Sequence, residues 1–236
     1  MPYEDQYFKG WHCEPSKKVH PSLERENSDF GHGYALHAFR KNTLNQPFTD
    51  DKLFALRAVK QRGDSLRLMS TELRNDEDVV LEAVQQDGLA LRFASSVLKR
   101  ERELVATAIT QNGWALEHTA LFFRKDRELV EIAVRQKPTA LQWVGEELRS
   151  DKKIVLLAVS KYGNALQWAS EELADDDSVV KVACSQNGSA LRFASDRLRG
   201  NKSMVILAAK SNGEALKYCT EAMLGYHEVI QAAMSR

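Results

Sequence analysis

Residues 76–98, which read D-E-D-V-V-L-E-A-V-Q-Q-D-G-L-A-L-R-F-A-S-S-V-L, are one copy of a unit that recurs along most of this 236-residue chain. One glycine marks the spacing, because it returns at every 25th residue and is replaced once by proline. The seven positions are Gly63, Gly88, Gly113, Pro138, Gly163, Gly188 and Gly213. A fixed period of this length is typical of solenoids, in which each unit packs only on its neighbours.

Each unit predicts two helices. In the first half, Val79, Val80, Ala83 and Val84 fall on one helical face. The second half, A-L-x-h-A-S-x-x-L, predicts a shorter helix. An Asp or Asn at the head of the first helix can accept hydrogen bonds from its first turn, and Glu101 is a poorer cap. The predicted caps are Asp51, Asp76, Asp126, Asp151, Asp176 and Asn201.

The turn between the two halves predicts two structural roles. Glycine after a helix supplies a left-handed residue without steric cost. Pro138 cannot adopt positive φ, so we expect the turn of the fourth unit to be built differently. The glutamine column just before the turns is expected to bond to loops of adjacent units. Its members are Gln61, Gln86, Gln111, Gln136 and Gln186.

A large residue recurs in the second half of each unit. We interpret this column as packing between stacked helices, with His118 as a packed histidine, and not as a cofactor site. The column consists of Phe93, His118, Trp143, Trp168, Phe193 and Tyr218.

The predicted fold is an all-α α-solenoid of 25-residue two-helix repeats, with seven units plus degenerate caps. Residues 1–32 form an irregular N-terminal arm, residues 33–50 a degenerate capping helix and linker, and residues 51–236 the helical-repeat domain. The arm carries prolines, glycines and aromatic residues without a sustained helical or strand period.

Units such as Y-G-N-A-L-Q-W-A-S-E-E-L-A-D-D (162–176) and L-R-N-D-E-D-V-V-L-E-A-V (73–84) resemble the tandem repeats of the domain-of-unknown-function family four-one-one-six. That family's domain is similar to two of these units in tandem. The likeness covers about residues 51–236, and Pro138 and Gly145 depart from its pattern. The resemblance implies a helical-repeat fold, and it implies no activity, catalytic residue or cofactor.

Composition limits the classes of function. Lys and Arg number 33, as do Asp and Glu, so the formal net charge is zero, which argues against a protein that gains affinity by neutralising phosphates.

The three cysteines lack paired spacing, and we expect a reducing intracellular compartment, the cytoplasm. Cys184 and Cys219 fall in apolar columns and are predicted to be small core residues. No apolar run is long enough to span a bilayer.

Motifs for catalysis or metal binding are missing from the sequence. His12, Cys13 and His20 in the arm are a weak ligand set for a metal, and no nucleotide-binding, zincin or serine-hydrolase motif occurs. We therefore expect a protein that is not an enzyme and that uses no cofactor or metal.

Two units place apolar residues in columns that are polar elsewhere. We predict a contiguous exposed patch over the second and third units, and such patches mark interaction sites. The aromatic residues of the arm either dock on a partner or cover this patch. The predicted function is a non-catalytic interaction or scaffold protein, an accessory subunit that binds other proteins. The predicted contact residues are Tyr7, Phe8, Trp11, Leu89, Val97, Trp114, Leu121 and Phe122.

The alternative function is a nucleic-acid or ribosome-associated binder, although the zero net charge counts against it. It would use a basic stripe formed by Arg67, Arg92, Arg192 and Lys217. A second column of Arg and Lys and the acidic pairs near it are interpreted as a solvated face of alternating charge.

Overall fold

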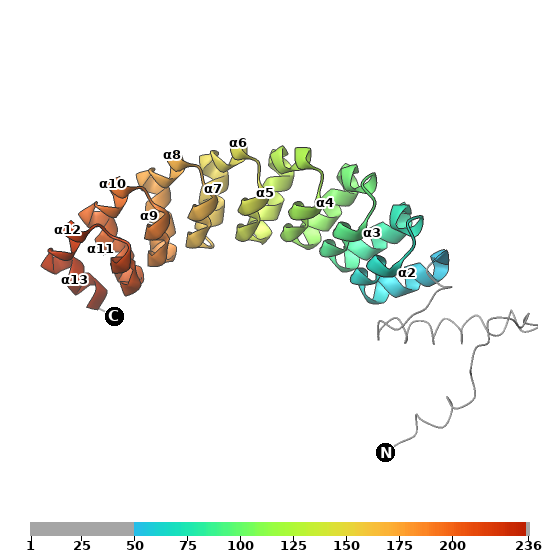
Figure 1. Ribbon diagram of the computed structural model, residues 1–236, viewed down its shortest axis with the longest axis horizontal. Coiled ribbons are helices and arrows are strands. Elements are labelled where there is room, and N and C mark those ends of the chain that lie inside the picture. The colour runs from blue at the N-terminus through green and yellow to red at the C-terminus, as the bar shows by residue number, and fades with distance from the viewer. Residues whose placement is uncertain (1–49, 235–236) are drawn as a thin grey trace, which may run out of the picture. The chain divides into compact units, whose positions relative to one another are not determined.

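The computed structural model describes residues 50–234. The predicted arm, most of the predicted capping helix, and the predictions for Tyr7, Phe8, Trp11, His12, Cys13 and His20 lie outside this range. Residues 50–234 consist of helices and turns without a strand, and successive repeats stack side by side in a curved row (Figure 1). The all-α solenoid is confirmed.

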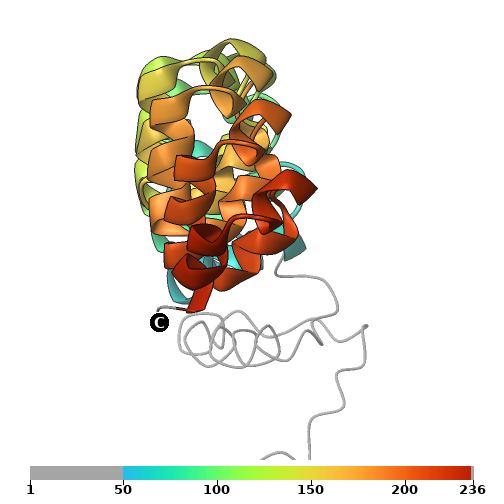
Figure 2. The same cartoon turned by 90° about the vertical axis from the view of Figure 1, so that its left-hand side faces the viewer.

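The first helix of each repeat is α-helical and packs on the first helix of the next repeat. Seen from the end where the C-terminus lies, the repeats follow one another in nearly the same orientation (Figure 2). These helices are α2 (Lys52–Gln61), α3 (Glu77–Gln86), α4 (Arg102–Gln111), α5 (Arg127–Gln136), α7 (Lys152–Val159), α9 (Asp177–Gln186), α11 (Lys202–Ser211) and α13 (His227–Met234).

The predicted N-caps are confirmed. The side chains of Asp51, Asp76, Asp126, Asp151, Asp176 and Asn201 each accept a hydrogen bond from a backbone N–H in the first turn. The Glu101 side chain makes no such bond to α4. A short carboxylate or amide reaches the orphan N–H groups of the first turn, and the longer glutamate does not hold that geometry.

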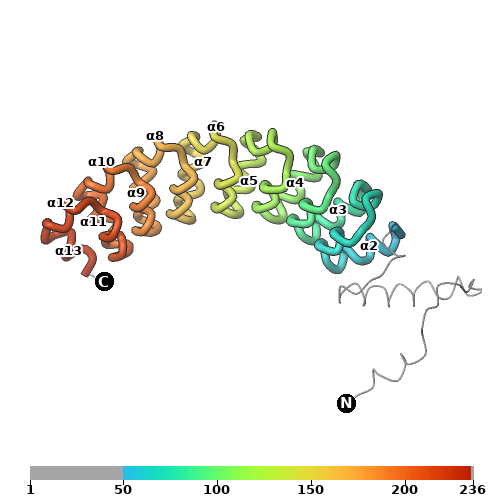
Figure 3. Tube along the Cα trace, viewed as in Figure 1, coloured from blue at the N-terminus to red at the C-terminus, as the bar shows by residue number. Residues whose placement is uncertain are grey.

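The second half of each repeat is not one helix. A 3₁₀ helix follows the turn: η3 (Gly63–Leu68), η5 (Gly88–Phe93), η7 (Gly113–His118), η9 (Pro138–Trp143), η10 (Gly163–Trp168), η11 (Gly188–Phe193) and η12 (Gly213–Lys217). A third short helix comes next: η4 (Leu73–Asn75), η6 (Leu98–Arg100), η8 (Leu121–Lys125), α6 (Glu146–Arg149), α8 (Glu171–Ala174), α10 (Asp196–Arg199) and α12 (Glu221–Leu224). The tube in Figure 3 shows this three-part path repeating along the stack.

Hydrogen bonds between repeats explain the break. Ala94 is extended after η5, with φ −62° and ψ 157°. The next residue, Ser95, donates its backbone N–H to the carbonyl of Arg74 in the preceding repeat at 2.9 Å. Because this N–H donates to a neighbouring repeat, it cannot donate to a carbonyl of its own repeat and extend the helix.

The core lies between successive repeats. Val79, Val80, Ala83 and Val84 of α3 are fully buried, as the period predicts. The aromatic column is half-buried in each repeat, so the prediction that it packs between stacked helices is only partly right. The alanine and leucine that precede it, such as Ala90 and Leu91, fill the interior instead.

The turn glycine does not adopt the predicted left-handed conformation. None of the described glycines has φ in that region. A Cβ at Gly88 would instead lie closer than 3.0 Å to the carbonyl oxygen of Ala108 in the next repeat. The absence of a Cβ at this position therefore permits the close approach between repeats.

Four of the five members of the glutamine column bond to these turns, as predicted. The backbone N–H groups of Gly63, Gly88 and Gly163 donate at 2.6 Å to the Oε1 atoms of Gln86, Gln111 and Gln186, respectively. Gly113 donates to Gln136 in the same way. Each glutamine thus connects the end of one first helix to the turn of the preceding repeat.

The turn at Pro138 keeps the usual backbone, contrary to prediction. Lys137 before it is extended, with φ −131° and ψ 96°, and η9 starts at the proline. What differs is the hydrogen bond between the turn and the next repeat. Pro138 has no N–H to donate, and Lys161 stands where the neighbouring repeats have the accepting glutamine. The Lys161 Nζ donates to the Arg135 carbonyl at 2.6 Å.

Candidate interaction surfaces

The third helices lie along the outer side of the curved row (Figure 1). Two exposed residues at or beside the start of each third helix form a continuous strip, which we call the outer edge. Its members are Thr71 and Glu72, Ser96 and Val97, Leu121 and Phe122, Glu146 and Glu147, Glu171 and Glu172, Asp196 and Arg197, and Glu221 and Ala222.

The second and third repeats make the outer edge apolar. Val97, Leu121 and Phe122 are 59%, 73% and 50% exposed. The Phe122 ring packs against Phe123, with centroids 4.2 Å apart, and the Arg100 guanidinium lies 5.6 Å from its centroid. These contacts orient one face of Phe122 and leave half of the ring in solvent.

Leu89 and Trp114 lie elsewhere, so the predicted contiguous patch is divided. Trp114 follows the C-terminal end of α4, whereas Phe122 precedes the N-terminal end of α5, and ten-residue helices span about 15 Å. Trp114 is 40% exposed and Leu89 is half-buried. The Trp114 Nε1–H donates to the Thr139 hydroxyl at 2.7 Å, and Lys137 Nζ lies 5.1 Å from the indole centroid.

The predicted basic stripe is exposed and interrupted. Arg92 and Arg192 lie over Phe93 and Phe193, at 4.4 Å and 4.2 Å from the ring centroids. Lys217 forms an ion pair with Glu214 at 2.7 Å, and Arg67 stands at the same position in the first repeat. Between Arg92 and Arg192 this column reads Glu117, Gln142 and Gln167. The stripe therefore forms two basic groups without a continuous track for a polyanion.

The second column of Arg and Lys is half-buried, and its members are Arg74, Lys99, Arg124, Arg149 and Arg199. The Lys99 Nζ donates to the Arg92 carbonyl, and Arg124 donates to the Glu117 carbonyl, both at 2.7 Å. Burial lowers the pKa of His118, and the charges of Lys99 and Arg92 lower it further. These cations satisfy backbone carbonyls within their own repeats.

The two described cysteines differ in accessibility. Cys184 is fully buried in α9, and burial raises the pKa of its thiol to about 12, as expected for a core residue. Cys219 is half-buried, so the prediction that it is a core residue is only partly right. Its Sγ–H donates to the Leu216 carbonyl at 3.2 Å.

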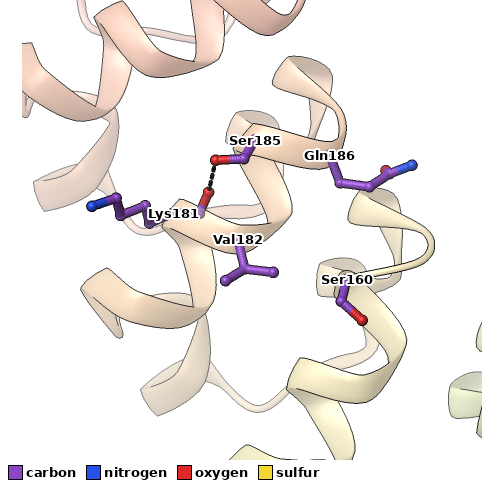
Figure 4. A pocket seen from close by; sticks show the side chains of 5 residues that line it. All are labelled: Ser160, Lys181, Val182, Ser185 and Gln186. Atoms are coloured by element: carbon purple, nitrogen blue, oxygen red, sulfur yellow. Dashed lines mark hydrogen bonds between the residues drawn. The ribbon is translucent and has the colours of Figure 1, made fainter.

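One depression, shown in Figure 4, is shallow and open, with a volume of about 400 Å³. Its lining brings one ionisable group, Lys181, together with Val182 and three polar side chains.

The described residues contain no cluster of three metal-ligating side chains. Within the same residues, no helix has the length and apolar character needed to cross a membrane.

Repeats of one α-helix and two short helices, each packed on the next, define an α-solenoid repeat protein. Five overlapping matches to the family described as Domain of unknown function (DUF4116) cover residues 51–99, 101–149, 126–174, 151–199 and 176–224, and the chain belongs to this family. Each match spans two repeats, as the resemblance implied. No curated protein and no solved structure matches the chain.

Proposed function

We propose that this chain is a non-catalytic scaffold or accessory protein that binds another protein through the exposed surface of its repeats. The observation that carries the proposal is the apolar outer edge. Leu121 and Phe122 occupy positions that hold glutamates in the next two repeats, and they expose large apolar side chains to solvent. Exposed aromatic and aliphatic groups are the usual anchors of protein interfaces.

The proposal is tested by recovery of a partner. The tagged full-length chain is purified from cells that express it, and its complexes are separated by size and identified by mass spectrometry. We expect a protein that co-elutes in near-stoichiometric amount. Recovery of the chain alone, at the size of its own mass, would contradict the proposal.

Photo-crosslinking then locates the contact. A photoreactive phenylalanine analogue replaces Phe122 in one variant and Glu72 in the control, because Glu72 occupies the same outer-edge position in the first repeat. We expect the partner to crosslink at position 122 and not at position 72. Equal crosslinking at both positions would show that the contact is not specific to the apolar part of the outer edge, and crosslinking at neither would place the contact elsewhere.

A further inference from the structure

The outer edge changes character along the stack, from apolar in the second and third repeats to acidic in the fourth and fifth. We infer that this strip docks a protein segment in which large apolar side chains are followed by lysine or arginine. The inference rests on the proposed function, for which it names the class of partner.

The two halves form one continuous surface because hydrogen bonds join the repeats along this edge. Ala120 donates its backbone N–H to the Lys99 carbonyl at 3.3 Å, and Gly145 donates to Arg124 at 2.8 Å. Ser170 donates to the Arg149 carbonyl at 3.1 Å. Each bond lies directly before a third helix, so α6 and α8 follow η8 along the same side of the row (Figure 1).

The acidic half presents exposed carboxylates, and those of Glu171 and Glu172 have no cationic partner among the described residues. Glu146 is 93% exposed, and its distance to Arg149 is 3.8 Å. Glu147 forms an ion pair with Lys125 at 2.9 Å. Within residues 50–234 no cation lies at ion-pair distance from Glu171 or Glu172. An external lysine or arginine can therefore approach α8 without displacing a cation of the stack.

Charge determines the class of partner. A nucleic acid or an anionic lipid surface that reached Leu121 and Phe122 would meet the four glutamates of α6 and α8, and like charges repel. A basic protein segment would gain attraction at the same place. Electrostatic complementarity of this kind contributes to specificity and to the rate of association.

Repeat spacing sets the length of the segment. Packed helices lie about 8–10 Å apart, so two repeats separate η8 from α8 by roughly 20 Å. An extended chain covers this distance in about six residues, at roughly 3.3 Å per residue. A helical segment needs about thirteen residues. The recognised sequence therefore has its basic residues at one of these two spacings from its apolar residues.

The experiment measures fluorescence anisotropy of labelled peptides with the full-length chain. The first peptide has Leu and Phe followed, six residues later, by two lysines, and a second set uses thirteen-residue helical spacing. In matched peptides the lysines are replaced by glutamate, or Leu and Phe by serine. The protein variants are Leu121→Ser with Phe122→Ser, and Glu171→Gln with Glu172→Gln. The control, Glu221→Gln, lies on the same edge in the seventh repeat.

We expect the apolar–lysine peptide of one spacing to bind the unmodified chain and the control variant equally. The Leu121 and Phe122 substitutions should weaken binding roughly tenfold or more, as loss of two anchors does. The glutamine substitutions should weaken it about threefold at low salt and less at high salt. The lysine-to-glutamate peptide should bind worst.

Equal binding of the lysine and glutamate peptides, or of the unmodified chain and both edge variants, would overturn the inference. Failure of both spacings to bind would also overturn it. Because the substituted side chains are exposed, an unchanged circular dichroism spectrum should accompany each variant. If a partner co-purifies equally with all variants, the proposed function stands and this docking surface fails. If no partner co-purifies with any of them, the proposed function fails.

Discussion

At the scale of single residues, the recurring glycine is fixed by space and not by backbone conformation. At Gly63, Gly88, Gly113, Gly163 and Gly188, a Cβ would lie closer than 3.0 Å to an alanine carbonyl of the next repeat. Backbone cannot move aside as a flexible side chain can. The period visible in the sequence therefore reports a contact between units 25 residues apart.

Replacing Gly88 with alanine tests this explanation. The added methyl group would force α4 away from η5 and strain the hydrogen bond to Gln111, so we expect a loss of about 2 kcal/mol or more in the free energy of unfolding by urea. Gly200→Ala is the control, because its nearest neighbour would lie at 3.4 Å. Equal stability of the two variants would show that close approach is not the constraint.

At the scale of elements, the capping aspartates join successive first helices. The Asp176 carboxylate caps α9 and also accepts from Lys152 Nζ at 2.7 Å. Asp151 caps α7 and pairs with Arg127 at the same distance. Hydrogen bonding to Arg127 lowers the pKa of Asp151, and that to Lys152 lowers the pKa of Asp176. Only the cap was predicted, although Lys or Arg recurs after several of the capping residues.

Asp176→Asn separates the cap from the ion pair. Asparagine still caps, as Asn201 does, but it carries no charge. Because the folded pKa of Asp176 is depressed below the unfolded value of about 3.9, its stabilisation is present above that value and is lost as pH falls towards the folded pKa. We expect a loss of about 0.5–1 kcal/mol at pH 7 and a shallower loss of stability below about pH 4. Urea unfolding between pH 7 and pH 3 measures both.

Lys152→Met and the double variant complete the cycle for this ion pair. If the two substitutions act additively at pH 7, the ion pair does not contribute to stability.

The junction between the fourth and fifth repeats lacks the hydrogen bond that its neighbours have. Pro138 and Lys161 remove the donor and the acceptor together, and α7 ends two residues earlier than α5 does. The double variant Pro138→Gly with Lys161→Gln restores both groups. We expect it to be more stable than the sum of its single variants by about 1 kcal/mol, the net worth of one hydrogen bond.

Pro138→Gly alone should destabilise, because it increases the conformational freedom of the unfolded chain. Urea unfolding of the four proteins gives the coupling, and amide hydrogen exchange at the end of α7 should slow only in the double variant. Absence of coupling would show that the lost bond has no energetic consequence.

At the scale of the repeat stack, stability comes from contacts between neighbouring repeats. Each first helix packs on the next, from α2 on α3 to α11 on α13. In such an array, removal of one whole unit brings together two surfaces of the same kind.

Deletion of residues 151–175 tests this organisation. It joins the third helix of the fourth repeat to Asp176, which caps the next first helix. We expect a folded helical protein whose urea m-value falls by roughly a tenth, in proportion to the surface removed. The control deletes residues 151–162 and should unfold the stack locally, because half a unit brings mismatched faces together. Similar spectra and midpoints for both deletions would contradict a stack of equivalent units.

The sequence by itself determined the period, the first helices, their caps and the partner of the glutamine column. These features depend on side chains a few residues apart, or on one unit meeting an identical neighbour. The pattern therefore predicts correctly that Val79 is buried, that Asp76 caps its helix and that Gln86 bonds to the turn of the preceding repeat.

Only the tertiary structure decided the role of the glycine, the division of the second half, and the separation of Trp114 from Phe122. Each depends on the distance and angle at which successive repeats meet. The backbone N–H of Ser95 bonds to Arg74 and ends a helix that its local sequence allows. Because successive repeats stack in nearly the same orientation, Trp114 lies near the C-terminal ends of the first helices and Phe122 near their N-terminal ends, about 15 Å apart.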